Sequence, residues 1–83
     1  MRVLIAEDHP VTRRLLVAQL TKWGYEVVVC SDGRQAWDAL SVDDAPALVV
    51  LDWMMPEVTG LSLCRQIRQL GRDPYTYIIL LTA

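Results

Sequence analysis

Short apolar runs alternate along this chain with segments of helical pattern, and this alternation constrains the fold more than any other feature. Four runs rich in apolar, β-branched and aromatic side chains predict strands, at residues 3–6, 25–30, 47–51 and 75–83. The run at 47–51 is apolar throughout, which is typical of strands that helices cover on both faces of a parallel sheet. The alternating order of strands and helices therefore predicts an α/β fold.

Three helical segments separate these runs, and residues that favour caps and turns mark their ends. The first begins at Pro10, which suits the first turn of a helix because its missing N–H would have no partner there, and it ends at Gly24. The second follows the capping residues 31–33. The third spans about 59–70 and ends before Gly71.

Length and charge narrow the class of protein. The chain has 83 residues, 53% of them hydrophobic and 22% charged, which is the composition of one globular domain. Its net charge of −2 comes without a basic block, so we expect no direct contact with nucleic acid. The longest apolar runs are far shorter than the roughly 18 residues needed to cross a bilayer, and the stretch before Glu7 is too brief for a signal peptide. We therefore expect a cytoplasmic protein without a membrane span.

Three acidic residues fall where two neighbouring strands end. Right-handed crossovers in the usual doubly wound arrangement give the strand order 2-1-3-4, so the winding reverses between the strands at 3–6 and 47–51. Ligands bind at such a point, and Glu7, Asp8 and Asp52 follow these two strands. Clustered carboxylates repel one another unless a cation lies among them, and a few hard oxygen ligands suit Mg²⁺. Taken singly, Asp8 would be a helix cap and Asp52 an ordinary strand-end residue.

Four motifs occur together in this chain. Glu7-Asp8 follows the apolar run V-L-I-A, C-S-D-G-R-Q-A occupies residues 30–36, D-x-M-M-P-x-x-x-G occupies 52–60, and L-L-T-A occupies 80–83. In this combination the chain resembles the receiver domain of bacterial two-component response regulators. The resemblance covers the whole chain, and it implies a flavodoxin-like parallel sheet in a single, partial receiver domain over residues 1–83.

The resemblance implies that the acidic cluster takes part in phosphoryl transfer. Asp52 would be the phosphoacceptor, taking a phosphoryl group from a sensor histidine kinase or a phosphotransfer protein. Asp8 and Asp52 would bind Mg²⁺ directly, together with the backbone carbonyl of Met54. Glu7 would act through a bound water. The protein would then be a signalling switch and not a turnover enzyme.

The end of the fourth predicted strand would complete the phosphate site. The resemblance implies that the Thr82 hydroxyl and the Ala83 backbone N–H contact a phosphate oxygen. Taken alone, Thr82 would be a strand-end residue favoured for its β propensity. Receiver domains continue through a further helix, strand and helix, with a lysine that contacts the phosphate, and this chain has no counterpart of them. We therefore expect either a fragment of a longer chain or a partner that supplies the missing cover.

The first predicted helix carries apolar side chains on two sides, which one sheet face cannot cover. At 100° per residue, its two stripes lie roughly 140° apart. The first stripe contains Val11, Leu15 and Ala18, and the second contains Leu16, Leu20 and Trp23. We expect the sheet to leave the second stripe uncovered.

The fourth predicted strand also suggests an alternative function. It lies at the edge of the sheet, and its residues 77–81 lack the charge or proline that protects such edges, so we expect a homodimer through this strand. The alternative is a truncated, signalling-silent receiver that acts as a dimerisation or docking module. Two other classes fit less well, because an aspartyl-phosphate hydrolase would place D-x-D after the first strand and a Rossmann nucleotide binder would place G-x-G-x-x-G there.

Overall fold

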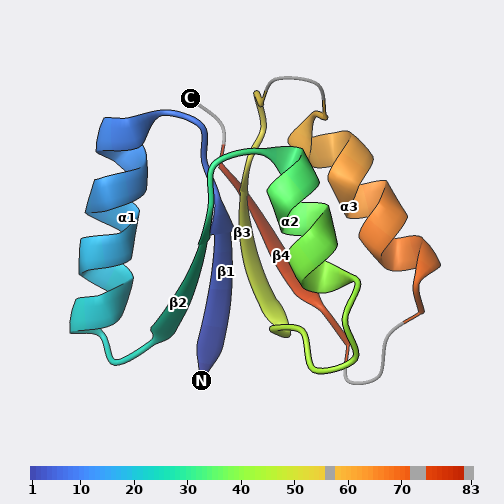
Figure 1. Ribbon diagram of the computed structural model, residues 1–83, viewed down its shortest axis with the longest axis horizontal. Coiled ribbons are helices and arrows are strands. Elements are labelled where there is room, and N and C mark those ends of the chain that lie inside the picture. The colour runs from blue at the N-terminus through green and yellow to red at the C-terminus, as the bar shows by residue number, and fades with distance from the viewer. Residues whose placement is uncertain (56–57, 72–74, 82–83) are drawn as a thin grey trace.

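The strands form one parallel sheet, and helices cover both of its faces (Figure 1). The computed structural model describes residues 1–55, 58–71 and 75–81. The strands are β1 (Arg2–Ala6), β2 (Glu26–Cys30), β3 (Leu48–Asp52) and β4 (Tyr77–Leu81). They lie in the order β2-β1-β3-β4, and every neighbouring pair is parallel. The predicted α/β class and strand order are confirmed, and the element bounds shift only slightly from the prediction.

The helices α1 (Pro10–Lys22), α2 (Gly33–Leu40) and α3 (Gly60–Gln69) connect the strands. Each begins after a residue whose side chain accepts a hydrogen bond from a backbone N–H of the first turn. These caps are His9 for α1, Asp32 for α2 and Thr59 for α3. Because His9 caps α1, the interpretation of Asp8 as the cap of this helix is wrong.

Both faces of the two central strands are buried, as the continuous apolar run at 47–51 had predicted for β3. The face toward α2 and α3 carries Leu4, Val49 and Leu51, which pack in one cluster with Ala36, Leu40, Leu63 and Ile67. The face toward α1 carries Val3, Ile5 and Val50. Burial of a large aliphatic side chain contributes about 1.5–3 kcal/mol, so these clusters hold β1 and β3 firmly in register.

The expected orientation of α1 is wrong. Leu16 and Leu20 pack on the sheet with the cluster of Val3, Ile5 and Val50, whereas Val11 and Leu15 face away and are 56% and 66% exposed. The spacing of apolar residues places Leu16 and Leu20 on one side of the helix, but Trp23, assigned to the same stripe, is 65% exposed. The spacing also does not say which side meets the sheet. That choice is made by the packing of α1 against the sheet.

The strand β4 forms one edge of the sheet. Among the described residues it pairs only with β3, and its side chains Tyr77 and Ile79 are 64% and 51% exposed. Within the described ranges, no helix has the length and apolar content required to span a membrane.

Candidate functional site

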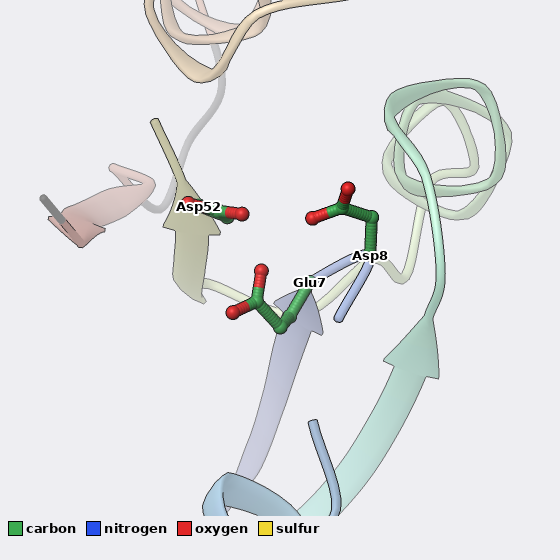
Figure 2. A group of neighbouring side chains, drawn as sticks. All are labelled: Glu7, Asp8 and Asp52. Carbon is green, nitrogen blue, oxygen red and sulfur yellow. The ribbon is translucent and has the colours of Figure 1, made fainter. Parts of the chain in front are cut away.

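Glu7, Asp8 and Asp52 meet at the carboxyl edge of the sheet. Glu7 and Asp8 directly follow β1, and Asp52 ends β3, the neighbouring parallel strand. Figure 2 shows their side chains pointing into the same space above the two strand ends. One carboxylate oxygen from each residue lies within 4.8 Å of the others. The structure therefore brings together the acids that the sequence had placed at this edge.

The three side chains lie at different depths. Glu7 is 6% exposed, Asp52 is half-buried and Asp8 is exposed. The buried oxygen Glu7 Oε2 has no hydrogen-bond partner among the described residues. A buried polar atom without a hydrogen-bond partner lowers the stability of the fold by about 1–3 kcal/mol. A ligand that binds this oxygen would remove that penalty.

The pKa values of Glu7 and Asp52 are shifted in opposite directions. Burial, together with hydrogen bonding to Asp52 and the charges of Asp52 and Asp8, raises the pKa of Glu7 from 4.5 to about 7. Burial acts to raise the pKa of Asp52 as well, but hydrogen bonds from the Glu7 side chain and the Met54 backbone outweigh it and lower that pKa. Without a cation, Glu7 therefore holds a proton up to near-neutral pH while Asp52 stays charged.

The loop after β3 is tied to the elements on either side of it. The backbone N–H of Met54 donates to Asp52 Oδ1 at 3.3 Å, and that of Trp53 donates to the carbonyl of Leu81 in β4 at 2.9 Å. The N–H of Gly60, at the start of α3, donates to the Trp53 carbonyl at 3.1 Å. These bonds fix the backbone from which the Asp52 carboxylate projects.

The start of α3 approaches the Asp52 backbone so closely that only glycine fits. A Cβ atom on Gly60 would lie 2.5 Å from the Asp52 carbonyl oxygen and 3.1 Å from its carbonyl carbon. Gly60 is the last residue of the motif at 52–60, and the motif alone does not explain why a glycine is needed there. The close approach gives Gly60 a role, because it lets the start of α3 pack against the backbone that carries the Asp52 carboxylate.

Arg13 contacts the site although the sequence analysis gave it no role. Its Nη1 donates to the backbone carbonyls of Glu7, at 3.1 Å, and Asp8, at 3.3 Å. In the sequence, Arg13 and Arg14 look equivalent. At 100° per residue, however, Arg13 lies on the side of α1 that also carries Leu20. This shared side distinguishes Arg13 from Arg14 once it is known that the Leu20 side meets the sheet.

The donor set suits a small, hard cation. Three carboxylates converge, and one of them is buried with an oxygen that has no partner in the described ranges. A cation among them would relieve both the repulsion and the desolvation. The role of the Met54 carbonyl as a ligand stays a prediction. Thr82 and Ala83 lie outside the described residues, so their predicted contacts with phosphate also stay predictions.

Comparison with known proteins places these features in a family. Residues 3–83 match the response regulator receiver domain. The response regulator MprA of Mycolicibacterium vanbaalenii is 42% identical over 83 residues, which are 100% of this chain and 35% of that protein. The chain thus spans about a third of the length of this curated relative.

Solved receiver domains have a similar structure. The receiver domain of the Francisella response regulator 1452 has a TM-score of 0.88 and 28% identity, covering 99% of this chain and 65% of that one. The receiver domain of a sensor histidine kinase from Pseudomonas aeruginosa has a TM-score of 0.87 and 32% identity, covering 99% of this chain and 66% of that one. The latter was solved with a magnesium ion coordinated in its active site cleft.

Proposed function

Because the chain belongs to the response regulator receiver domain family, we propose that it receives a phosphoryl group on Asp52 in two-component signalling. The donor would be a sensor histidine kinase or a phosphotransfer protein, and residues 1–83 would form a single, partial receiver domain. The observation that carries the proposal is the convergence of Glu7, Asp8 and Asp52, in which Asp52 alone combines a lowered pKa with a half-buried position. A charged, oriented carboxylate is a competent phosphoryl acceptor.

The proposed transfer needs little covalent chemistry from the protein. A carboxylate oxygen of Asp52 attacks the phosphorus of the phosphohistidine, a P–O bond forms, and the P–N bond breaks with its electron pair remaining on the imidazole nitrogen. Asp8, Asp52 and the Met54 carbonyl would hold Mg²⁺ directly, and Glu7 would hold it through a water. Bound Mg²⁺ supplies charge neutralisation at the transferring oxygens. The Thr82 hydroxyl and Ala83 N–H would donate to a phosphate oxygen.

This chemistry describes a switch rather than a turnover enzyme, because the product stays attached to the protein as an aspartyl phosphate. The input would come from a kinase, and the aspartyl phosphate would be the signal that is read. A cytoplasmic location and the lack of direct contact with nucleic acid stay predictions.

Incubation of the 83-residue chain with Mg²⁺ and a small acyl phosphate tests the proposal. We expect intact mass spectrometry to show the addition of one phosphoryl group, and Asp52→Asn to abolish it. Asp38→Asn is the matched control, since Asp38 is 65% exposed on α2 and its loss removes the same charge away from the site. Equal phosphorylation of Asp52→Asn and the unsubstituted chain would refute the assignment of Asp52.

Binding of Mg²⁺ is tested separately by fluorescence. Trp53 adjoins Asp52 and is 39% exposed, so we expect its emission to respond to Mg²⁺ at millimolar order, as for a weakly caged ion. Asp52→Asn should remove the response, and Asp38→Asn should retain it. A response that survives in Asp52→Asn would place the ion elsewhere.

We also propose that the 83-residue chain forms a homodimer through β4. Tyr77 and Ile79 expose apolar surface on this edge strand and line a cavity of about 730 Å³ together with Met1, Tyr25 and Leu48. An edge strand with exposed apolar side chains favours pairing with a second copy. The family assignment does not favour the alternative of a signalling-silent dimerisation or docking module.

A further inference from the structure

The side chain of Arg13 reaches from the first turns of α1 back to the loop after β1. Its Nη1 donates to two successive carbonyls, those of Glu7 at 3.1 Å and Asp8 at 3.3 Å. Both carbonyls belong to residues whose carboxylates face Asp52. One guanidinium group therefore holds the backbone of two members of the acidic cluster.

The peptide units on either side of Glu7 are fixed from opposite directions. Its N–H donates to the carbonyl of Cys30, at the end of β2, at 3.2 Å, while its carbonyl accepts from Arg13. Asp8 is exposed, and Arg13 holds its carbonyl too. The Glu7 and Asp8 side chains therefore project from backbone that Arg13, a residue outside the cluster, binds through its guanidinium group.

The contact differs from charge neutralisation. The described residues contain an ion pair between Arg34 and Asp38, but Arg13 makes none with a carboxylate in these ranges. Its donors bind neutral carbonyl oxygens instead. A nearby positive charge by itself would oppose the binding of a cation, so a positioning role and a purely electrostatic role have opposite consequences for Mg²⁺ affinity.

We propose that Arg13 is a positioning residue, which orients the Glu7 and Asp8 carboxylates for cation binding by holding their backbone carbonyls. This inference rests on the proposed Mg²⁺ site. Residues that orient metal ligands from outside the first coordination shell contribute substantially to affinity, because the ligands are then ordered before the ion arrives.

Mg²⁺ titration of variants of the 83-residue chain, followed by tryptophan fluorescence, tests this role, since Trp53 adjoins the site. We expect Arg13→Met to weaken Mg²⁺ binding about tenfold, at the lower end of the range for residues that orient metal ligands. Arg14→Met is the matched control, because Arg14 is exposed, adjacent to Arg13 and equally charged. The Arg14→Met variant should bind Mg²⁺ as tightly as the unsubstituted chain. Arg13→Lys, which keeps the charge and one donor group, should restore part of the affinity.

The possible outcomes separate this inference from the function on which it rests. If the unsubstituted chain shows no Mg²⁺ response that Asp52→Asn removes, the metal site fails and the inference falls with it. If that response is present but Arg13→Met binds Mg²⁺ as tightly as Arg14→Met, or more tightly, the inference alone is refuted. Circular dichroism checks folding. Should Arg13→Met not fold, Arg13→Lys and Arg14→Lys are compared, and equal affinities refute the role.

Discussion

Glu7 makes the stability of the metal-free protein depend on pH. Its pKa is about 7 in the folded protein against 4.5 ordinarily, so between these values the folded state holds more protons than the unfolded state. Stability therefore falls as pH rises through this window. We expect the free energy of unfolding to fall by about 1–3 kcal/mol across it in the absence of divalent cations.

Urea denaturation in the presence of a chelator, at about pH 5 and about pH 8, measures this loss. Glu7→Gln keeps the size of the side chain without its ionisation and should flatten the pH dependence over this window. Glu26→Gln is the control, because Glu26 is exposed at the start of β2. The interpretation is wrong if Glu7→Gln retains the full pH dependence.

Gly60 shows how one missing Cβ positions a functional residue. A Cβ here would meet backbone atoms of Asp52 and Trp53, which cannot turn aside as a flexible side chain can. We expect Gly60→Ala to cost about 1–3 kcal/mol of stability and to weaken the Mg²⁺ response, because α3 and the loop after β3 must move apart.

Gly24→Ala is the comparison for this prediction. Gly24 has φ 91°, but a Cβ there would meet nothing within 4 Å. We expect a cost of about 1–2 kcal/mol from the left-handed backbone alone, with an unchanged Mg²⁺ response. Equal effects of the two variants on Mg²⁺ binding would show that the close approach of Gly60 does not position Asp52.

Among the helices, α2 is short enough for its cap to matter. Asp32 Oδ1 accepts from the Gln35 N–H at 2.8 Å, and Gln35 Oε1 in turn accepts from the Ser31 N–H at 2.9 Å. We expect Asp32→Ala to lower the free energy of unfolding by about 1 kcal/mol, because the Gln35 N–H loses its acceptor.

The control for the cap lies in the same helix. Within the part of the chain that the structure describes, Asp38 forms an ion pair only with Arg34, across exposed surface at 3.6 Å, so Asp38→Ala should cost less than about 0.5 kcal/mol. Both variants are compared by the midpoint of urea denaturation. A cost for Asp38→Ala as large as that for Asp32→Ala would contradict the assignment of capping as the dominant contribution.

At the scale of the whole chain, the proposed dimer involves one edge strand of the sheet, β4, and not the other, β2. We expect sedimentation to show a dimer of the 83-residue chain and Ile79→Lys to weaken it, because Ile79 is 51% exposed on β4. Val29→Lys places the same charge on β2, the opposite edge, and should leave the dimer intact. Circular dichroism confirms folding of both variants. A well-folded monomer of the unsubstituted chain at high micromolar concentration would contradict the proposal.

The sequence by itself determined the order of elements, the parallel sheet and the convergence of the acids. These features follow from local rules: an apolar run at 47–51 must be covered on both faces, and acids that follow neighbouring parallel strands must meet at one edge. The prediction of Glu7, Asp8 and Asp52 as one cluster needed nothing more than this topology.

The tertiary structure alone decided how these parts meet. In it, Leu16 and Leu20 of α1 pack on the sheet. Arg13, and not its neighbour Arg14, donates to the loop that carries the acids, and Gly60 lies against the backbone of Asp52. The periodicity of a helix fixes which residues share a side but leaves the rotation of that helix free. Rotation is set by packing between segments distant in the chain, and no local pattern records it.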